Sequence, residues 1–138
     1  MRDETILIVD DSPDNLILTQ FLLESEGFSV RTAEDAEQAL EVLRTYRPSL
    51  ILMDLQLPGV DGLELTRRLR ASADFREVTI VALTAYAMKG DEENALGAGC
   101  DGYITKPIDT RTFPSVVRGY FEGRHKLGDV VAPALKCP

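Results

Sequence analysis

Short apolar runs recur along the chain and are separated by longer segments with helical periodicity. Three of the runs are almost purely apolar, at residues 6–9, 50–53 and 78–83. Runs of this kind are typical of strands that are buried on both faces of a parallel sheet. Residues 28–32 alternate between apolar and polar, which predicts an edge strand with one wetter face, and residues 103–105 form a shorter fifth candidate. The pattern therefore predicts five strands.

A helix is predicted between each strand and the next, and one more after the last strand. Ser12 and Pro13 provide an N-cap and a first-turn proline for the first helix, which ends at Gly27. Ile17 and Phe21 repeat within it at helical spacing. The four helices after the first are expected at about residues 36–43, 62–72, 88–98 and 110–121. The helix at about residues 88–98, the fourth of the five, is the least apolar.

Strands that alternate with helices in this way indicate right-handed crossovers between parallel strands. The predicted fold class is therefore α/β, with a five-stranded parallel sheet and helices on both faces. No linker or internal repeat interrupts the pattern, so residues 1–123 are predicted to form one domain. The periodicity stops after Gly123, and residues 124–138 are predicted to form a C-terminal tail.

The composition indicates which classes of binding partner to exclude and which cellular compartment to expect. The chain has 138 residues, of which 28% are charged, and a formal net charge of −8. An acidic chain without clustered Lys and Arg is not expected to bind nucleic acid. No apolar stretch approaches membrane-spanning length, no signal peptide is recognised, and the two cysteines lie in no CxxC or Cys/His cluster. A cytoplasmic protein that does not bind membranes is therefore expected.

Polar residues follow four of the predicted strands. Asp10 and Asp11 follow the first strand, Asp54 the third, Thr84 the fourth and Lys106 the fifth. Ligands of open parallel α/β sheets bind at the carboxyl ends of the strands, so these side chains are expected to share one rim. If the first and third strands are neighbours, three carboxylates crowd together and repel one another, which predicts a bound cation. Mg²⁺ suits such oxygen ligands and keeps positions for phosphate and water.

An aspartate surrounded by a metal ion, an ammonium group and a hydroxyl group can attack a phosphoryl group. Lys106 offers the ammonium group and Thr84 the hydroxyl donor. Asp54 would then hold an acyl phosphate, and the protein would contribute positioning and charge neutralisation. Each residue alone is better explained as an ordinary loop residue or helix cap. Only the combination points to phosphoryl chemistry.

Four motifs surround these residues in a fixed order and spacing. They are residues 6–11, residues 51–59 with Asp61 and Gly62, residues 82–85, and residues 103–107. In these motifs, and over about residues 4–121, the chain closely resembles the receiver domains of two-component response regulators, which act in bacterial phosphorelay signalling. The resemblance implies the CheY-like, flavodoxin-like strand order 2-1-3-4-5. It also implies a phosphoacceptor signalling domain rather than an enzyme, one that catalyses only its own phosphotransfer and autodephosphorylation.

The resemblance implies a role for each acidic residue of the rim. Asp54 would be the phosphoacceptor. Asp11 would ligate Mg²⁺ directly and Asp10 through water, and the main-chain carbonyl of Gln56 would be a further ligand. Mn²⁺ is expected to substitute for Mg²⁺. All of these family positions are present in the sequence.

The resemblance also implies how the signal is transmitted. Lys106, joined to Pro107 by a cis bond, would bind the phosphoryl oxygens. Thr84 and Tyr103 would be the switch pair, in which the hydroxyl moves to the phosphoryl group and the aromatic ring turns inward. The implied donor is a histidine kinase or a histidine phosphotransfer protein. A downstream protein would bind the face made by the fourth helix, the fifth strand and the fifth helix.

Residues 84–91 resemble two subgroups in particular, the stand-alone DivK-like regulators and the receivers fused to hybrid histidine kinases. The initiating Met favours the first, whereas the short tail is equally consistent with the cut end of a longer polypeptide. Two other classes compete with this interpretation. A phosphatase of the haloacid dehalogenase type needs a second Asp at the position of Gln56. A receiver that docks without phosphorylation usually lacks an acidic residue or the lysine, and neither is lacking here.

Overall fold

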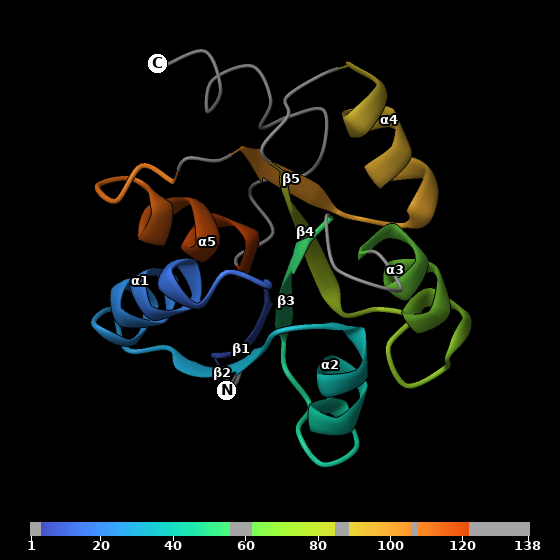
Figure 1. Cartoon of the computed structure of the whole chain (residues 1–138), viewed down its shortest axis with the longest axis horizontal. Coiled ribbons are helices and arrows are strands. Elements are labelled where there is room, and N and C mark those ends of the chain that lie inside the picture. Colours follow the sequence, from blue (N-terminus) through green and yellow to red (C-terminus); the bar gives the residue numbers. More distant parts are fainter. Residues whose placement is uncertain (1–3, 56–61, 85–88, 106–107, 122–138) are drawn as a thin grey trace.

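The computed structural model describes residues 4–55, 62–84, 89–105 and 108–121 of the chain. Within these ranges strands and helices alternate, as the apolar pattern predicts (Figure 1). The strands are β1 (Thr5–Val9), β2 (Ser29–Ala33), β3 (Leu50–Asp54), β4 (Thr79–Thr84) and β5 (Gly102–Thr105). The helices are α1 (Pro13–Glu24), α2 (Ala36–Leu43), α3 (Gly62–Ala71), α4 (Lys89–Ala98) and α5 (Phe113–Phe121).

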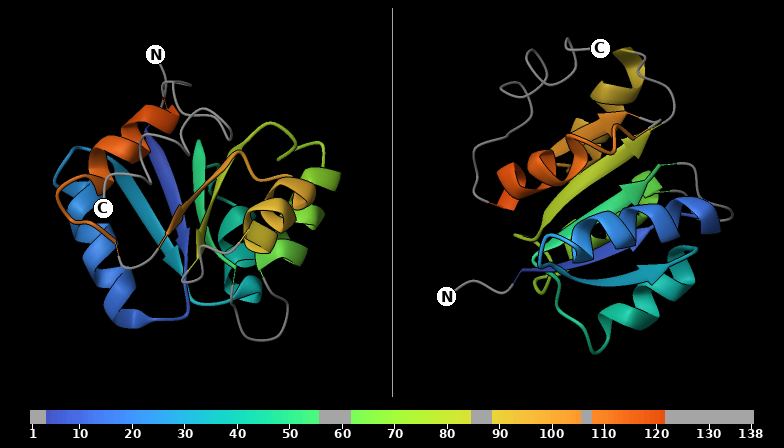
Figure 2. Two further views of the ribbon diagram at one scale, coloured as in Figure 1. Left: turned by 90° about the horizontal axis from the view of Figure 1, so that it is seen from above. Right: turned by 90° about the vertical axis from the view of Figure 1, so that its left-hand side faces the viewer.

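The strands form one parallel sheet in the order β2-β1-β3-β4-β5, which confirms the predicted α/β class and strand order. Helices α1 and α5 lie on one face of the sheet, and α2, α3 and α4 lie on the other (Figure 2). The strand order reverses between β1 and β3. In open sheets of this kind ligands bind at the carboxyl ends of the strands where such a reversal occurs.

Each central strand contributes alternate side chains to two buried clusters. Ile6 and Ile8 of β1 pack on the side of α1 and α5, whereas Leu7 and Val9 pack on the side of α2, α3 and α4. All four are 0% exposed. Burial on both faces explains why the run is apolar at every position rather than at every second one.

Helix α1 does not bury the apolar repeat that predicts it. Leu16 and Leu23 are buried toward the sheet, whereas Ile17 and Phe21 are 68% and 67% exposed. The helix carries more than one apolar row, and only one row can face the strands beneath it. The spacing of Ile17 and Phe21 therefore predicts the helix correctly but does not predict its buried face.

Helix α5 begins later than the expected position near residue 110. Residues 110–112 form a turn instead, and the helix starts at Phe113. The Asp109 carboxylate accepts a hydrogen bond from the Arg111 N–H at 3.0 Å, and the Asp109 carbonyl accepts from the N–H of Thr112 at 3.2 Å. Local bonds of this kind compete with a regular first helical turn, which accounts for the later start.

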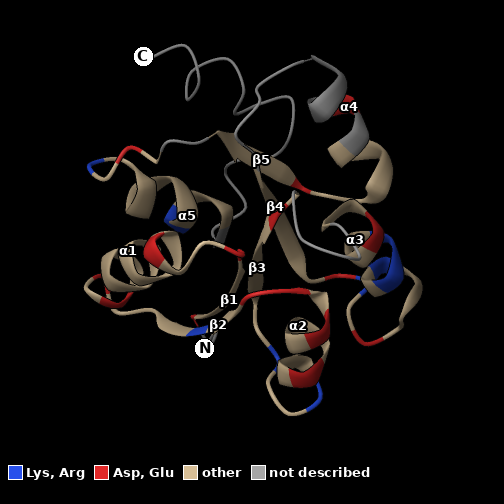
Figure 3. Ribbon diagram, in the orientation of Figure 1, with Lys and Arg blue, Asp and Glu red and all other residues tan. Residues whose placement is uncertain are grey.

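The charged side chains of the described residues are spread over the helices and loops around the sheet (Figure 3). On α3, Arg67 and Arg68 form ion pairs with Glu64 at 3.6 Å and 3.3 Å. These side chains are about half exposed, so the pairs contribute little to stability. In the part of the chain that the structure describes, no helix has both the length and the apolar character needed to cross a membrane.

Candidate functional site

The strand register brings the predicted carboxylates together. Val9 of β1 pairs with Met53 of β3, so Asp10 and Asp54 follow at the same level of neighbouring strands. Asp10 is 0% exposed and Asp54 is 3% exposed. Asp11, the next residue, is exposed. One carboxylate oxygen from each of the three aspartates lies within 4.8 Å of the other two, so the predicted cluster is present.

The first turn of α1 fixes the position of Asp10. The backbone N–H of Ser12 donates to Oδ1 of Asp10 at 2.9 Å, and the side-chain amide of Asn15 donates to Oδ2. Ser12 is also the N-cap of α1, because its hydroxyl accepts from the N–H of Asn15 at 3.3 Å. The predicted cap therefore also orients a carboxylate of the cluster. The sequence analysis missed Asn15, whose only signal is its place on the first turn of the helix that follows the aspartates.

Gly62, the first residue of α3, lies against the end of β3. Its N–H donates to the carbonyl of Leu55 at 3.3 Å. A Cβ atom at this position would lie 2.2 Å from the carbonyl oxygen of Asp54 and 2.9 Å from Cα of Leu55. Backbone atoms cannot move aside as a flexible side chain can. The close approach of α3 to Asp54 therefore requires glycine.

The buried carboxylates repel each other. Two unit charges 4.8 Å apart at an effective dielectric constant of about 20 repel by about 3.5 kcal/mol. The Ser12 and Asn15 donors offset part of the charge on Asp10. A divalent cation bound by all three aspartates would reduce the repulsion further, and their hard oxygen ligands suit Mg²⁺ or Mn²⁺. The donor set therefore fits a divalent cation.

The structure describes only some of the other predicted site residues. The backbone of Thr84 ends β4 beside β5, and its side chain is not among those described. The Tyr103 side chain is 9% exposed and belongs to the buried cluster beneath α3 and α4, so it already points inward. The predicted movement of this pair stays a prediction. The remaining predicted residues lie outside the described ranges: Gln56, Lys106 and Pro107.

Fold and site together define a class of protein: a flavodoxin-like α/β domain with an acidic cluster suited to a cation at its switch point. The family model of the response regulator receiver domain matches residues 6–118 of the chain. The chain therefore belongs to the receiver domain family, which confirms the resemblance seen in its motifs. It is a signalling domain of the two-component type.

The similar proteins include members of both subgroups that residues 84–91 resemble. The polar-differentiation response regulator DivK of Brucella anthropi is 40% identical over 117 residues, which cover 85% of this chain and 95% of the relative. The receiver domain of a sensor histidine kinase from Pseudomonas aeruginosa is 36% identical, with a TM-score of 0.78 over 88% of this chain and 99% of that one. That structure has a magnesium ion coordinated in its active-site cleft. A CheY-like receiver domain protein from Methanospirillum hungatei is 29% identical, with a TM-score of 0.80 over 89% of this chain and 97% of that one.

Proposed function

We propose that Asp54 accepts a phosphoryl group from a histidine kinase or a histidine phosphotransfer protein. The observation that carries the proposal is the position of Asp54, buried at the end of β3 with Asp10 and Asp11 within 4.8 Å. A carboxylate oxygen of Asp54 would bond to phosphorus while the bond between phosphorus and the donor's imidazole nitrogen breaks. The electron pair of that bond returns to the imidazole, and the product is an acyl phosphate.

The proposed cofactor is Mg²⁺, for which Mn²⁺ can substitute. When bound, the ion neutralises charge on the transferred phosphoryl group. The ligands we propose are Asp10, Asp11, Asp54 and the main-chain carbonyl of Gln56. Asn15 and Ser12 keep the Asp10 carboxylate turned toward the cluster. Lys106 is proposed to bind the phosphoryl oxygens through its ammonium group, a compact positive charge.

The output is proposed to pass through Thr84 and Tyr103 to the face made by α4, β5 and α5. Two contacts support this route: Thr84 pairs with Thr105 at the end of β5, and Tyr103 shares a buried cluster with Ala95 of α4. A protein partner would read this face. We propose a cytoplasmic receiver, either a DivK-like regulator or the receiver of a hybrid histidine kinase, that does not bind nucleic acid or membranes. Its receiver domain would span residues 1–123 and its tail residues 124–138.

The phosphoacceptor can be tested with acetyl phosphate and Mg²⁺ as the phosphodonor system. Mass spectrometry of the wild-type chain should show one added phosphate that hydroxylamine removes, and the Asp54→Asn variant should show none. Asp74→Asn is the matched control, because Asp74 is an exposed aspartate that pairs with Arg47 away from the cluster. A stable phosphate on Ser, Thr or His would contradict the mechanism.

The metal site can be tested separately by titrating the unphosphorylated chain with Mg²⁺ in a calorimeter. One site of millimolar affinity or tighter is expected from three converging carboxylates. Asp11→Ala should abolish the binding heat, and Asp74→Asn should leave it unchanged. Unchanged binding in Asp11→Ala would rule out the acidic cluster as the site.

A further inference from the structure

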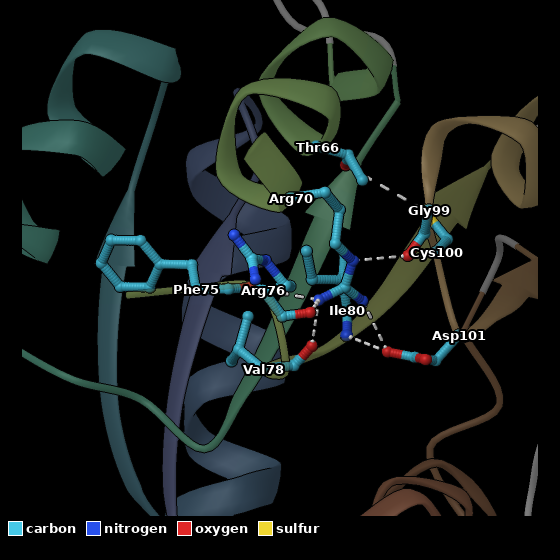
Figure 4. A network of polar contacts seen from close by, with 9 residues as sticks. All are labelled: Thr66, Arg70, Phe75, Arg76, Val78, Ile80, Gly99, Cys100 and Asp101. Atoms are coloured by element: carbon cyan, nitrogen blue, oxygen red, sulfur yellow. Dashed lines mark hydrogen bonds and ion pairs between the residues drawn. The ribbon is translucent and has the colours of Figure 1, made fainter. Parts of the chain in front are cut away.

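Arg70, near the end of α3, is the centre of a polar network that is separate from the acidic cluster (Figure 4). Its side chain is 19% exposed, and its guanidinium donates to groups from three different segments. The acceptors are the carbonyls of Phe75, Arg76 and Val78 at 3.2, 2.9 and 2.6 Å, the carbonyl of Gly99 at 2.8 Å, and Oδ2 of Asp101 at 2.8 Å. One side chain therefore joins the loop before β4, the end of α4 and the start of β5.

Asp101 extends the network to the sheet. The same Oδ2 atom accepts a hydrogen bond from the N–H of Ile80 in β4 at 2.9 Å, and the N–H of Asp101 donates to the carbonyl of Ile80 at 2.7 Å. Arg70 and Asp101 also form an ion pair at 2.8 Å. Hydrogen bonds with a charged partner are about twice as strong as neutral ones, and the planar fork of arginine serves several acceptors at once. The junction between α4 and β5 is thereby fixed to β4.

Gly99 fits directly under the Arg70 side chain. Its φ angle is +112°, and a Cβ atom there would lie 2.7 Å from Cγ of Arg70. The N–H groups of Gly99 and Cys100 both donate to the carbonyl of Ala95, at 3.2 Å and 2.9 Å, and end α4. Glycine is therefore required both by the backbone turn and by the packing of Arg70. Arg70 thus holds the C-terminal end of α4 itself.

The side chains of α4 that the structure describes, at residues 93 and 95–98, add little apolar contact to this attachment. Among them, Ala95 and Ala98 are buried, whereas Leu96 is 51% exposed. A Cβ atom at Gly97 would meet nothing within 4 Å. Two buried methyl groups provide little apolar contact, so the packing of these described side chains alone would hold the helix weakly. Among the described residues, the network of Arg70 is the strong attachment of α4, and it lies at the C-terminal end of the helix.

We infer that Arg70 is a positioning residue for the output face: it makes the Gly99–Asp101 junction a fixed point about which α4 turns when Asp54 is phosphorylated. The N-terminal end of α4, which follows β4, would move, and the C-terminal end would stay in place. The inference rests on the proposed function for the signal that moves the helix. Without Arg70 the same signal would displace both ends of the helix, and its effect on the partner surface would be less defined.

The anchor is tested first in the unphosphorylated full-length chain, by hydrogen exchange of the backbone amides. Arg70→Ala removes the five hydrogen bonds that the guanidinium donates, so exchange at residues 99–101 should become about ten-fold faster or more. Arg70→Lys keeps the positive charge but not the planar guanidinium fork, so exchange at residues 99–101 should become about three-fold faster. Arg68→Ala, on the exposed side of the same helix, is the matched control and should change exchange less than two-fold. Unchanged exchange in both Arg70 variants would overturn the anchor.

The fixed point is tested with beryllofluoride and Mg²⁺ as a mimic of the phosphorylated state. In the wild-type chain, amide chemical-shift changes should appear in the N-terminal half of α4 and be absent at residues 99–101. In Arg70→Lys they should extend to residues 99–101, while Mg²⁺ affinity and the protection of β1 and β3 stay as in wild type. Wild-type changes at residues 99–101 as large as those in the first half of α4 would overturn the inference. No response anywhere in wild type would overturn the proposed function, and the exchange result on the anchor would still stand.

Discussion

Replacing Asp54 with Asn should stabilise the metal-free protein. Asp54→Asn keeps the size of the side chain and one acceptor oxygen, but it removes one charge from the cluster. Ligand oxygens of Asp54 and buried Asp10 lie within 4.8 Å of each other, and two unit charges at that separation repel by about 3.5 kcal/mol at an effective dielectric constant of about 20. Asp11 adds less because it is exposed and water screens it. Salt and altered hydrogen bonding at residue 54 reduce the gain, so we expect the free energy of unfolding to rise by about 2 kcal/mol in EDTA.

Mg²⁺ should remove this advantage. An ion that binds only the folded state stabilises it by RT ln(1 + [Mg²⁺]/Kd), so the wild-type chain should gain stability as Mg²⁺ is added and the variant should gain much less. Urea unfolding followed by circular dichroism, in EDTA and across a series of Mg²⁺ concentrations, measures both effects. Asp74→Asn, at a side chain that is 63% exposed, should follow the wild type throughout. The reasoning is wrong if Asp54→Asn is no more stable than wild type in EDTA, or if Mg²⁺ stabilises both equally.

Three further predictions concern residues that support the site or the core. Asn15→Ala removes a donor to buried Asp10, so it should lower Mg²⁺ affinity about ten-fold in calorimetry and lower the unfolding free energy in EDTA by about 1–2 kcal/mol; equal affinity would show that the amide does not orient Asp10. Gly62→Ala puts a methyl group 2.2 Å from the carbonyl of Asp54 and should cost about 2 kcal/mol or more in urea unfolding; a neutral result would contradict the close approach. Burial raises the pKa of Tyr120 to about 12, so the folded chain keeps a proton that the unfolded chain loses from about pH 10. The stability that the Tyr120 proton contributes is complete below pH 10 and declines as the pH rises toward 12. Tyr120→Phe has no such proton, so from pH 10 to pH 12 its unfolding free energy should fall by about 2–3 kcal/mol less than that of the wild type.

The sheet could be predicted because burial on both faces leaves a clear pattern. Residues 6–9 and 50–53 are apolar at every position, and the structure places them in β1 and β3 at the centre of the sheet. The ends and faces of helices are set by weaker and more local effects. The start of α5 depends on the hydrogen bonds of Asp109, and the buried face of α1 depends on which apolar row meets the strands. Neither the start of α5 nor the buried face of α1 is encoded in the spacing of apolar residues, so periodicity could not reveal them.

The acidic cluster could be predicted because it needs only two facts, the position of each aspartate after a strand and the adjacency of β1 and β3. Arg70 could not be predicted in the same way. Its partners Gly99 and Asp101 are 29 and 31 positions away in the sequence, and its other acceptors are backbone carbonyls, which carry no sequence signal. In the sequence it is one of three arginines on α3. Only tertiary structure distinguishes it from Arg68, which pairs with Glu64 on the exposed side.

The distribution of burial determines which element can respond when charge is added at Asp54. The side chains of residues 6–9 in β1 and 50–53 in β3 are 0% exposed, and both strands pack against helices on each face. Moving either strand would open a close-packed core, which costs several kcal/mol for each large side chain that loses its contacts. In α4 the buried side chains that the structure describes are Ala95 and Ala98, which have few contacts to lose. The helix is also tied at its C-terminal end by Arg70. On these contacts a turn of α4 about Gly99 costs less than a shift of β1 or β3, so the proposed signal would reach a partner through that helix rather than through the sheet.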